Sequence, residues 1–408
     1  MLFWEFAGRV LSSGRLAIID ADGRRHVAGG TEGPRATIRL HDRALHRRLA
    51  LNPFLHVGEA YMDGTLSVEE GSLYDFMDIC AVNSHRAFAH PLGRAINFGQ
   101  SLLRRLHQHN PVRRAQANVA HHYDLSDRLY DLFLDSDRQY SCAYFTHPHD
   151  DLEQAQLDKK RHLAAKLLLR PGQRILDIGS GWGGLALYLA QAGAAQVVGI
   201  TLSEHQLEVS RERAQRRGLA DRVRFELRDY REQTGLFDRI VSVGMFEHVG
   251  VKHYEEFFRT LRRLLAEDGV ALVHSIGRMD GPGATNPWIR KYIFPGGYAP
   301  ALSEVLPVVE RLGLWVTDIE VLRLHYAETL RAWRRRFSAN RAKIAELYDE
   351  RFCRMWEFYL VGSELAFRRM GHMVFQMQLA KRQDAVPLTR DYIADWERGH
   401  LDAAIAAE

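Results

Sequence analysis

The fold is decided by the stretch Arg174–Ala190, which reads RILDIGSGWGGLALYLA. Its first residues, Arg174–Ile178, form the apolar run of a buried strand with Asp177 near its end. Glycines follow at positions 179, 181, 183 and 184, and leucines with helical spacing come next. Glycine turns let a backbone approach a ligand closely, and the first turn of a helix offers free N–H groups. The stretch therefore predicts the strand–turn–helix of a doubly wound α/β sheet that binds a nucleotide.

The chain that follows alternates between strand and helix patterns. Helices are expected between the strands, and the chain after the last strand reads as largely helical to about Leu379. The expected strands are Gln196–Thr201, Val223–Leu227, Asp238–Val243, Gly269–Ile276 and Leu314–Leu324. Strands that alternate with helices indicate a parallel sheet with crossover helices.

Three regions are expected along the 408 residues. Residues 1–110 read as a smaller α/β or α+β domain, in which Asp22-Gly23 is the turn of a hairpin. Residues 111–385 contain the alternating pattern and form the catalytic domain, and residues 386–408 form a helical tail.

The composition excludes several classes of protein. Cys80, Cys142 and Cys353 are too widely spaced for a disulfide framework or a zinc site, which favours a reducing, cytoplasmic location. The 20 histidines show no spacing of metal ligands, so no metal is expected. The N-terminal apolar run contains Glu5 and Arg9, so it is not a signal peptide, and no apolar run is long enough to cross a bilayer.

The glycine turn alone would also fit a dinucleotide site. Such a site usually has an acidic residue at the end of the second strand, whereas this strand continues with Thr201 and Leu202. Thr201 and Gln206 are therefore the candidates for the ribose hydroxyls. Asp229 and Tyr230, after the third strand, are the candidates for the amine and the ring of adenine.

Several motifs together resemble one family. The segments are HHYDLSDRLYDLFLD from residue 121, QYSCAYF from 139, GITLSEHQ from 199, SVGMFEHVG from 242 and NPWIRKYIFPGG from 286. With the glycine stretch, they resemble the cyclopropane-fatty-acyl-phospholipid synthases, and GEAYMDGTLS from residue 58 resembles the N-terminal domain of the bacterial members. Ser180 departs from the cysteine that close relatives usually carry between the glycines.

The resemblance implies a class I methyltransferase (Rossmann-like) fold that uses S-adenosylmethionine, with an N-terminal α+β lipid-binding domain. It implies methyl transfer to a cis double bond of a phospholipid acyl chain, proton loss to bicarbonate, and closure of a cyclopropane ring. Bicarbonate would be held by Cys142, Glu247, His274, the backbone at Ile276, and Tyr326. The residues expected to hold the cofactor are Tyr140, Ser141, Asp177, Gly179, Gly181, Thr201, Leu202, Gln206, Asp229 and Tyr230.

A substrate inside a bilayer requires a peripheral enzyme that docks on the membrane. Basic clusters at residues 104–114 and 331–336, and an amphipathic N-terminal helix, favour docking on anionic lipid at the inner face of the membrane. The resemblance also implies a homodimer. Two other activities stay open: alkene methylation without ring closure, which gives a methyl-branched or methylated unsaturated chain, and methylation of RNA or a small molecule. A lipid-binding protein without activity is the non-enzyme alternative, and no nucleic acid partner is expected.

Overall fold

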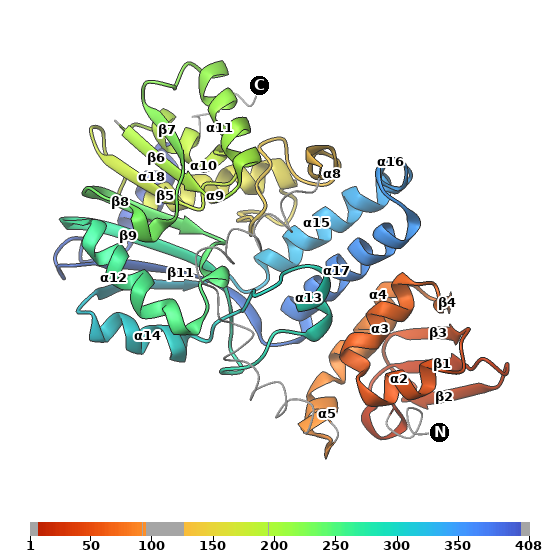
Figure 1. Cartoon of the computed structure of the whole chain (residues 1–408). Helices are drawn as coiled ribbons and strands as arrows, with labels where there is room; N and C mark the ends of the chain where they lie inside the picture. The colour runs from red at the N-terminus through yellow and green to blue at the C-terminus, as the bar shows by residue number, and fades with distance from the viewer. Residues whose placement is uncertain (1–6, 92, 95–125, 195, 401–408) are drawn as a thin grey trace. The chain divides into compact units, whose positions relative to one another are not determined.

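The computed structural model describes residues 7–91, 93–94, 126–194 and 196–400, and the chain divides into two compact units (Figure 1). The first unit comprises Met1–His107, Gly283–Pro295 and Leu330–His372, and the second comprises Gln108–Pro282, Gly296–Thr329 and Met373–Glu408. The sequence predicts one continuous catalytic domain over 111–385. The structure differs from this prediction, because Gly283–Pro295 and Leu330–His372 make their contacts within the first unit.

The second unit contains a seven-stranded sheet in the order β10-β11-β9-β8-β5-β6-β7. Its strands are β5 (Arg174–Ile178), β6 (Gln196–Thr201), β7 (Val223–Leu227), β8 (Phe237–Val243), β9 (Leu265–Arg278), β10 (Trp315–Val321) and β11 (His372–Ala380). β5 pairs in parallel with β6 on one side and with β8 on the other, while β10 and β11 pair antiparallel. The order of strands therefore reverses at β5, and an open α/β sheet binds its ligand at this point.

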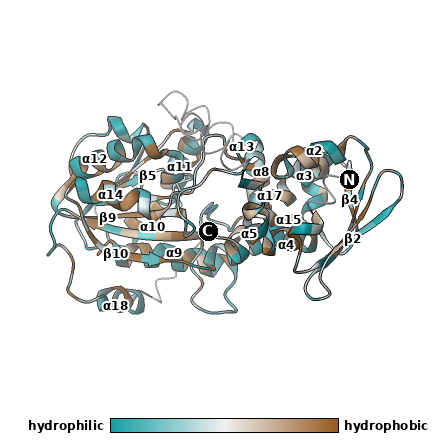
Figure 2. Cartoon of the chain, turned by 90° about the horizontal axis from the view of Figure 1, so that it is seen from below, coloured by the Kyte–Doolittle hydropathy of each residue, from teal (hydrophilic) through white to brown (hydrophobic). Residues whose placement is uncertain are grey.

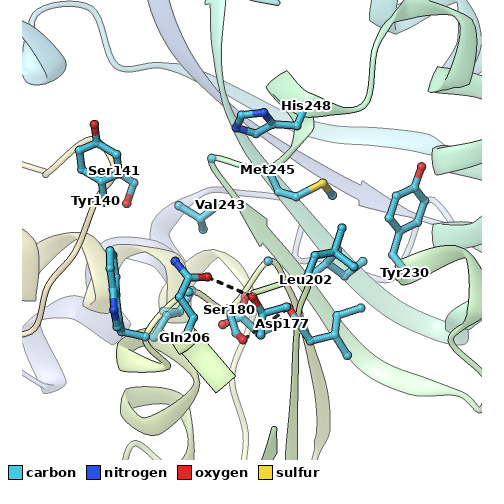
Figure 3. A pocket seen from close by; sticks show the side chains of 18 of the residues that line it. Tyr140, Ser141, Asp177, Ser180, Leu202, Gln206, Tyr230, Val243, Met245 and His248 are labelled. Carbon is cyan, nitrogen blue, oxygen red and sulfur yellow. Dashed lines mark hydrogen bonds between the residues drawn. The ribbon is translucent and has the colours of Figure 1, made fainter. Parts of the chain in front are cut away.

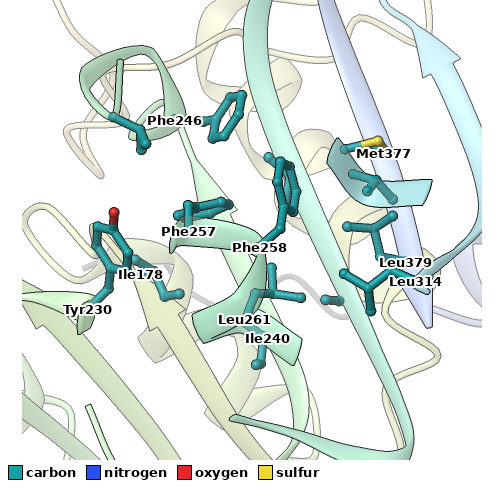
Figure 4. Close-up of a cluster of buried hydrophobic side chains, with 14 of the residues drawn as sticks. Ile178, Tyr230, Ile240, Phe246, Phe257, Phe258, Leu261, Leu314, Met377 and Leu379 are labelled. Carbon is teal, nitrogen blue, oxygen red and sulfur yellow. The ribbon is translucent and has the colours of Figure 1, made fainter. Parts of the chain in front are cut away.

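Helices accompany this sheet, and apolar side chains join them to it. They are α8 (Asp127–Asp131), α9 (Leu152–Lys166), α10 (Gly184–Gln191), α11 (Glu204–Arg216), α12 (Tyr254–Leu264), α14 (Leu302–Arg311) and α18 (Asp391–Gly399). One buried cluster contains Phe257, Phe258 and Leu261 of α12, which Figure 4 shows beside the strands. A second contains Leu163 of α9, Leu187 of α10 and strand residues such as Val197. Hydrophobic residues run along the strands of this sheet (Figure 2). Predicted strands and helices up to residue 276 match the observed ones within a few residues.

One prediction about this sheet is wrong. The segment before Leu379 is not helical throughout, because His372–Ala380 forms β11 between β10 and β9. Gln376 and Gln378 are fully buried in this strand. Polar residues at buried positions interrupt the apolar pattern from which a strand is predicted. Each finds a partner: Gln376 contacts His274, and Gln378 donates to the backbone oxygen of Lys166.

The first unit is an α+β structure, as the sequence predicts. Its sheet has the order β2-β1-β3-β4, and the predicted hairpin joins β1 to β2 through Gly23 in a left-handed conformation (φ 82°). The strands are β1 (Arg15–Ile19), β2 (Arg25–Gly29), β3 (Arg35–Leu40) and β4 (Leu66–Glu70). The helices are α2 (Leu45–Leu51), α3 (Pro53–Met62), α4 (Leu73–Val82), α5 (Ser84–Ala89), α13 (Pro287–Tyr292), α16 (Arg341–Leu347) and α17 (Glu350–Arg369), and α15 (His325–Ala339) begins in the second unit and ends in the first.

Some predicted features lie outside the described residues. These are the start of the N-terminal amphipathic helix, the domain boundary at residue 110, the arginines at 104–114 and the end of the C-terminal tail. Within the described ranges, no helix combines the length and the apolar character that crossing a bilayer requires.

Glu59 of α3 joins distant parts of the first unit through its buried carboxylate. It accepts hydrogen bonds from Lys291 Nζ (2.6 Å), Tyr292 OH (2.9 Å), His56 Nδ1 (2.7 Å) and Arg48 Nη2 (3.1 Å). These donors outweigh the effect of burial and lower the pKa of Glu59 to about 2. The carboxylate therefore holds α13, which is more than 200 residues away in the sequence, against α3.

We expect the substitution Glu59→Gln to lower the free energy of unfolding at pH 7 by about 2 kcal/mol. The pKa is depressed in the folded state, so this stabilisation is present above pH 4.5 and is lost as the pH falls toward 2. Urea unfolding of both proteins at pH 7 and pH 3 measures the difference, which should shrink at pH 3. Glu69→Gln, at an exposed position of β4, is the control and should change stability by less than about 0.5 kcal/mol. An equal loss at both pH values would contradict the assignment to the charge.

Candidate active site

A pocket opens at the carboxyl edge of the large sheet, where the strand order reverses (Figure 3). All the residues predicted to hold the cofactor line it, and Figure 3 shows Tyr140 and Tyr230 on opposite sides with Asp177 between them. The complete lining is Arg138, Gln139, Tyr140, Ser141, Asp177, Ile178, Gly179, Ser180, Gly181, Trp182, Leu185, Ile200, Thr201, Leu202, Gln206, Arg228, Asp229, Tyr230, Arg231, Val243, Gly244, Met245, His248 and Val249.

The glycine turn forms the floor of the pocket for steric reasons. Gly179 has a φ of 83°, and a Cβ there would lie 2.9 Å from Cβ of Met245. Gly181 also has a positive φ (55°), and a Cβ on it would meet no atom within 4 Å, so that position faces open space. At Gly181 the absence of a side chain therefore leaves the backbone accessible to a bound ligand.

Asp177 provides a buried acceptor beside this turn. Its side chain is 2% exposed, and Oδ2 has no hydrogen-bond partner among the described residues. Burial raises the pKa of Asp177 to about 7, against a smaller opposing effect of the Lys159 ammonium. A buried carboxylate oxygen without a donor is costly unless a ligand supplies one. The amino group of S-adenosylmethionine is a donor of the right charge, so the residues present fit this cofactor.

Thr201 and Gln206 form a pair at the end of β6. The Thr201 hydroxyl lies 3.0 Å from Oε1 of Gln206, and both side chains are buried. Ser203 caps α11 by accepting from the backbone N–H of Gln206 (3.2 Å). This pairing orients the Gln206 amide and leaves its nitrogen to donate to a ligand, and the ribose contact stays a prediction.

Asp229 and Tyr230 line the pocket, but Asp229 is already paired. Both of its carboxylate oxygens accept from the guanidinium of Arg231, at 2.8 and 2.7 Å. The sequence predicts a free carboxylate for the adenine amine and misses this arginine two positions further on. Tyr230 is 8% exposed and meets Phe257 edge to face, so one side of its ring belongs to the core while the residue also lines the pocket.

Glu247 lies just beyond β8 and contacts the end of β9. Its Oε1 accepts the backbone N–H of Ile276 at 2.7 Å, whereas Oε2 is buried and has no hydrogen-bond partner among the described residues. Burial raises the pKa of Glu247 to about 7, although the Ile276 N–H opposes this effect. The predicted backbone donor at Ile276 is therefore used by Glu247, and the second carboxylate oxygen is the one available to a ligand.

His274 is buried on the same strand, two residues before Ile276. Its Nδ1 lies 3.2 Å from Nε2 of Gln376 on β11. An amide nitrogen only donates, so Nδ1 accepts and the ring proton sits on Nε2. Burial, with Lys159 and other nearby cations, lowers the pKa of His274 to about 3, so the ring is neutral at physiological pH.

The segments that carry Cys142 and Tyr326 are joined by two hydrogen bonds between neighbouring residues. The N–H of Ala143 donates to Oγ1 of Thr329 (3.0 Å), and the N–H of Phe145 donates to Nδ1 of His325 (3.0 Å). These bonds fix the loop of Cys142 to the first turn of α15, which carries Tyr326. Cys142 is 1% exposed, and burial raises the pKa of its thiol, so it stays protonated.

Sequence analysis missed several residues of the pocket. Met245 and His248 lie in the same motif as Glu247, and Gln139 directly precedes Tyr140. Burial lowers the pKa of His248 to about 4, so this ring is also neutral. Their position inside the matching motifs was the available signal. The described residues contain no cluster of three or more side chains that could hold a metal ion.

The fold and the pocket define a class: the chain is a methyltransferase that uses S-adenosylmethionine. Two solved structures are similar to about two thirds of it. The cyclopropane synthase MmaA2 from Mycobacterium tuberculosis has a TM-score of 0.62 and 33% identity, and covers 67% of this chain and 99% of its own. Mycolic acid cyclopropane synthase CmaA1, complexed with SAH and CTAB, has the same TM-score and identity over 66% and 99%.

The sequence comparisons then give the family. The family model described as mycolic acid cyclopropane synthetase matches residues 110–377, and the chain belongs to this family. The cyclopropane-fatty-acyl-phospholipid synthase of Escherichia coli is 37% identical over 346 residues, which is 85% of this chain and 88% of that protein. A probable fatty acid methyltransferase of Pseudomonas putida is 38% identical over 82% of this chain and 84% of its own.

Proposed function

We propose that this enzyme methylates a cis double bond in a phospholipid acyl chain and closes a cyclopropane ring, with bicarbonate as the base. The observation that carries the proposal is the second oxygen of Glu247, which is buried without a hydrogen-bond partner among the described residues, in a side chain that is bonded to Ile276, two residues after His274, and that adjoins His248 of the pocket lining. The relatives named as cyclopropane synthases support it.

The chemistry requires three things of the protein. S-adenosylmethionine, when bound, supplies an electrophilic methyl group. An alkene that takes this methyl becomes a carbocation, and loss of a proton from the new methyl closes the ring. The residues must therefore hold the cofactor, keep water from the cation, and place a base next to the new methyl group.

The cluster at the end of β9 fits an oxyanion with one proton. Glu247 Oε2 would accept from the hydroxyl of bicarbonate, and His274 Nε2–H would donate to one of its charged oxygens. Because Ile276 fixes the other oxygen of Glu247, the carboxylate cannot turn away. Cys142 and Tyr326 would complete the set, and the bonds from Ala143 to Thr329 and from Phe145 to His325 support this by joining the loop of Cys142 to the first turn of α15.

The product of the reaction tests this proposal directly. The protein is incubated with S-adenosylmethionine and vesicles of cis-unsaturated phospholipid, and the acyl chains are analysed by NMR for cyclopropane protons. Ring protons are expected, and the rate should fall in bicarbonate-free buffer and return when bicarbonate is added. Methyl incorporation without ring protons would reject ring closure, and a rate independent of bicarbonate would reject the base.

A second candidate is methylation of the same alkene without ring closure. Two relatives favour it by name: the P. putida protein, and tuberculostearic acid methyltransferase UfaA1 of M. tuberculosis, which is 34% identical over 90% of this chain. The same cation would then lose a proton from a carbon of the acyl chain to the base, which leaves a methylated unsaturated chain. The NMR spectrum distinguishes these products, which differ in their branch and olefinic signals.

We also propose that the protein docks peripherally on anionic bilayers and acts as a homodimer. The arginines of α15 support docking: the helix carries Arg331, Arg334, Arg335 and Arg336, of which Arg335 is exposed and Arg334 pairs with Glu364. Vesicle binding should weaken by at least about tenfold between 50 and 500 mM salt and be weak on neutral lipid, as measured by sedimentation. Binding that is equal on both lipids at every salt concentration would contradict the electrostatic part.

The homodimer has its own test. Analytical ultracentrifugation should give twice the monomer mass, and a single monomer peak would exclude the dimer.

A further inference from the structure

A buried lysine lies next to the cofactor pocket without a charged partner of its own. Lys159 of α9 is 0% exposed, and its Nζ donates to Oε1 of Gln139 (2.6 Å) and to Oγ of Ser141 (2.9 Å). Among the described residues it forms no ion pair, although an uncompensated buried charge is costly. The carboxylates of Asp135 and Asp137 act on Lys159 only through space, and both acceptors of its hydrogen bonds line the pocket.

The two neighbouring carboxylates, Asp137 and Asp135, are held by other partners. Asp137 is neutralised by Lys160 Nζ at 2.7 Å, by Arg213, and by Arg217 at 3.7 Å. Asp135 accepts the backbone N–H groups of Asp137 (3.1 Å) and Gln139 (2.8 Å), and burial beside Asp137 raises its pKa to about 6. Neither carboxylate is therefore hydrogen-bonded to Lys159, although the charge of Asp135 acts on its ammonium through space.

Gln156, which lies on α9 like Lys159, also holds the loop of residues 139–141 in place. The amide nitrogen of Gln156 donates to the backbone oxygens of Gln139 (3.2 Å) and Ser141 (3.0 Å). In a trans peptide the C=O and N–H point in opposite directions, so these peptide groups turn their N–H sides away from α9. One helix thus sets both the side chains and the peptide planes of this loop.

We infer that Lys159 is a positioning residue for the carboxylate of the cofactor: its ammonium holds Gln139 and Ser141 in place and provides the buried positive charge that this carboxylate needs. Asp177, with its unpartnered oxygen, is the complementary negative charge for the cofactor's amino group. The amino-acid end of S-adenosylmethionine is a zwitterion. Two buried charges of opposite sign match it: Asp177 lines the pocket, and Lys159 lies behind the lining residues Gln139 and Ser141. Burial lowers the pKa of Lys159 to about 8, which is consistent with a charge that is completed by a ligand.

Two ligands that differ in the amino-acid end test the inference. S-adenosylhomocysteine carries the carboxylate, whereas 5′-methylthioadenosine shares the adenosine and sulfur but lacks it. By isothermal titration calorimetry, Lys159→Met should weaken S-adenosylhomocysteine at least tenfold and change 5′-methylthioadenosine less than twofold. Lys159→Arg retains the charge and should recover most of the preference for S-adenosylhomocysteine. These measurements need no turnover, so they stand or fall independently of ring closure and bicarbonate.

Lys166→Met is the matched control. Lys166 is equally buried on α9, but its ammonium pairs with Glu320 and Asp318 instead of the pocket loop. Its loss should leave the ratio of the two affinities unchanged. If Lys159→Met does not fold, Lys159→Gln replaces it, because the amide keeps a donor for the loop and removes only the charge. An unchanged ratio, or an equal loss for both ligands in a folded neutral variant, would show a purely structural lysine and overturn the inference.

Discussion

Replacing Glu247 with glutamine should lower kcat by about 10²–10³-fold while the affinity for S-adenosylhomocysteine stays within twofold. The amide oxygen of glutamine can still accept from Ile276, so the backbone of β9 keeps its partner. The other amide position carries protons and can no longer accept the hydroxyl of an oxyanion at the place of Oε2. Steady-state kinetics on vesicles and calorimetry with the cofactor product measure the two effects separately.

The pH dependence adds a second measurement on the same residue. The pKa of Glu247 is about 7, and the proposed role requires the ionised form, so kcat should rise as the pH increases through 7. Glu255→Gln, at an exposed position of α12 where the carboxylate pairs with Arg259 of the same helix, is the control and should retain the wild-type rate and profile. Full turnover of Glu247→Gln would remove this residue from the proton-accepting cluster. Equal losses of turnover and of cofactor affinity would reassign it to the cofactor pocket.

Replacing Asp177 with asparagine should weaken the binding of S-adenosylhomocysteine by about 50–100-fold. The substitution removes the charge that the amino group of the cofactor meets and places a second donor against it. 5′-Methylthioadenosine, which lacks that amino group, should lose less than about threefold. Calorimetry with the two ligands measures the difference, and an equal loss for both would mean that Asp177 only supports the glycine turn.

The same substitution should not lower the stability of the protein at pH 8. The folded-state pKa of Asp177 is raised from 3.8 to about 7, so ionisation in the folded protein opposes folding as the pH rises through this range. Asparagine removes that opposition, so Tm at pH 8 should equal or exceed the wild-type value. Asp238 lies on the neighbouring strand β8, where its carboxylate accepts the N–H of Arg174. Asp238→Asn is therefore the control, and it should leave ligand affinity unchanged. A large drop in Tm for Asp177→Asn would show that the carboxylate of Asp177 has stabilising partners in the protein without a ligand.

Local patterns were enough to predict the pocket but not its internal pairings. The glycine turn and Asp177 are consecutive in the sequence, and the ends of parallel strands meet at one edge, so the location of the site follows directly. The bond from Ile276 to Glu247 and the arginine on Asp229 depend on side-chain rotamers, which no pattern encodes. The cluster of Cys142, Glu247, His274 and Tyr326 was predicted through the family resemblance alone.

The errors have a common physical cause in long-range contacts. β11 was missed because Gln376 and Gln378 are buried, and their partners His274 and Lys166 lie over 100 residues away. Likewise, Glu59 shows nothing unusual in its local sequence, yet it binds Lys291 of a segment that belongs to the first unit. Contacts between segments so far apart leave no periodic signal.

The core of the first unit has a consequence for how the protein is made. Val361 and Leu365 of α17 belong to the same buried cluster as Leu16 and Ile38, although they follow His107 by about 250 residues. At a synthesis rate of about 5–20 residues per second, the N-terminal strands wait roughly 10–50 s on the ribosome before that helix emerges. Their apolar face is exposed during this time, so the nascent chain should be a client of ribosome-associated chaperones, and its folding cannot finish domain by domain from the N-terminus.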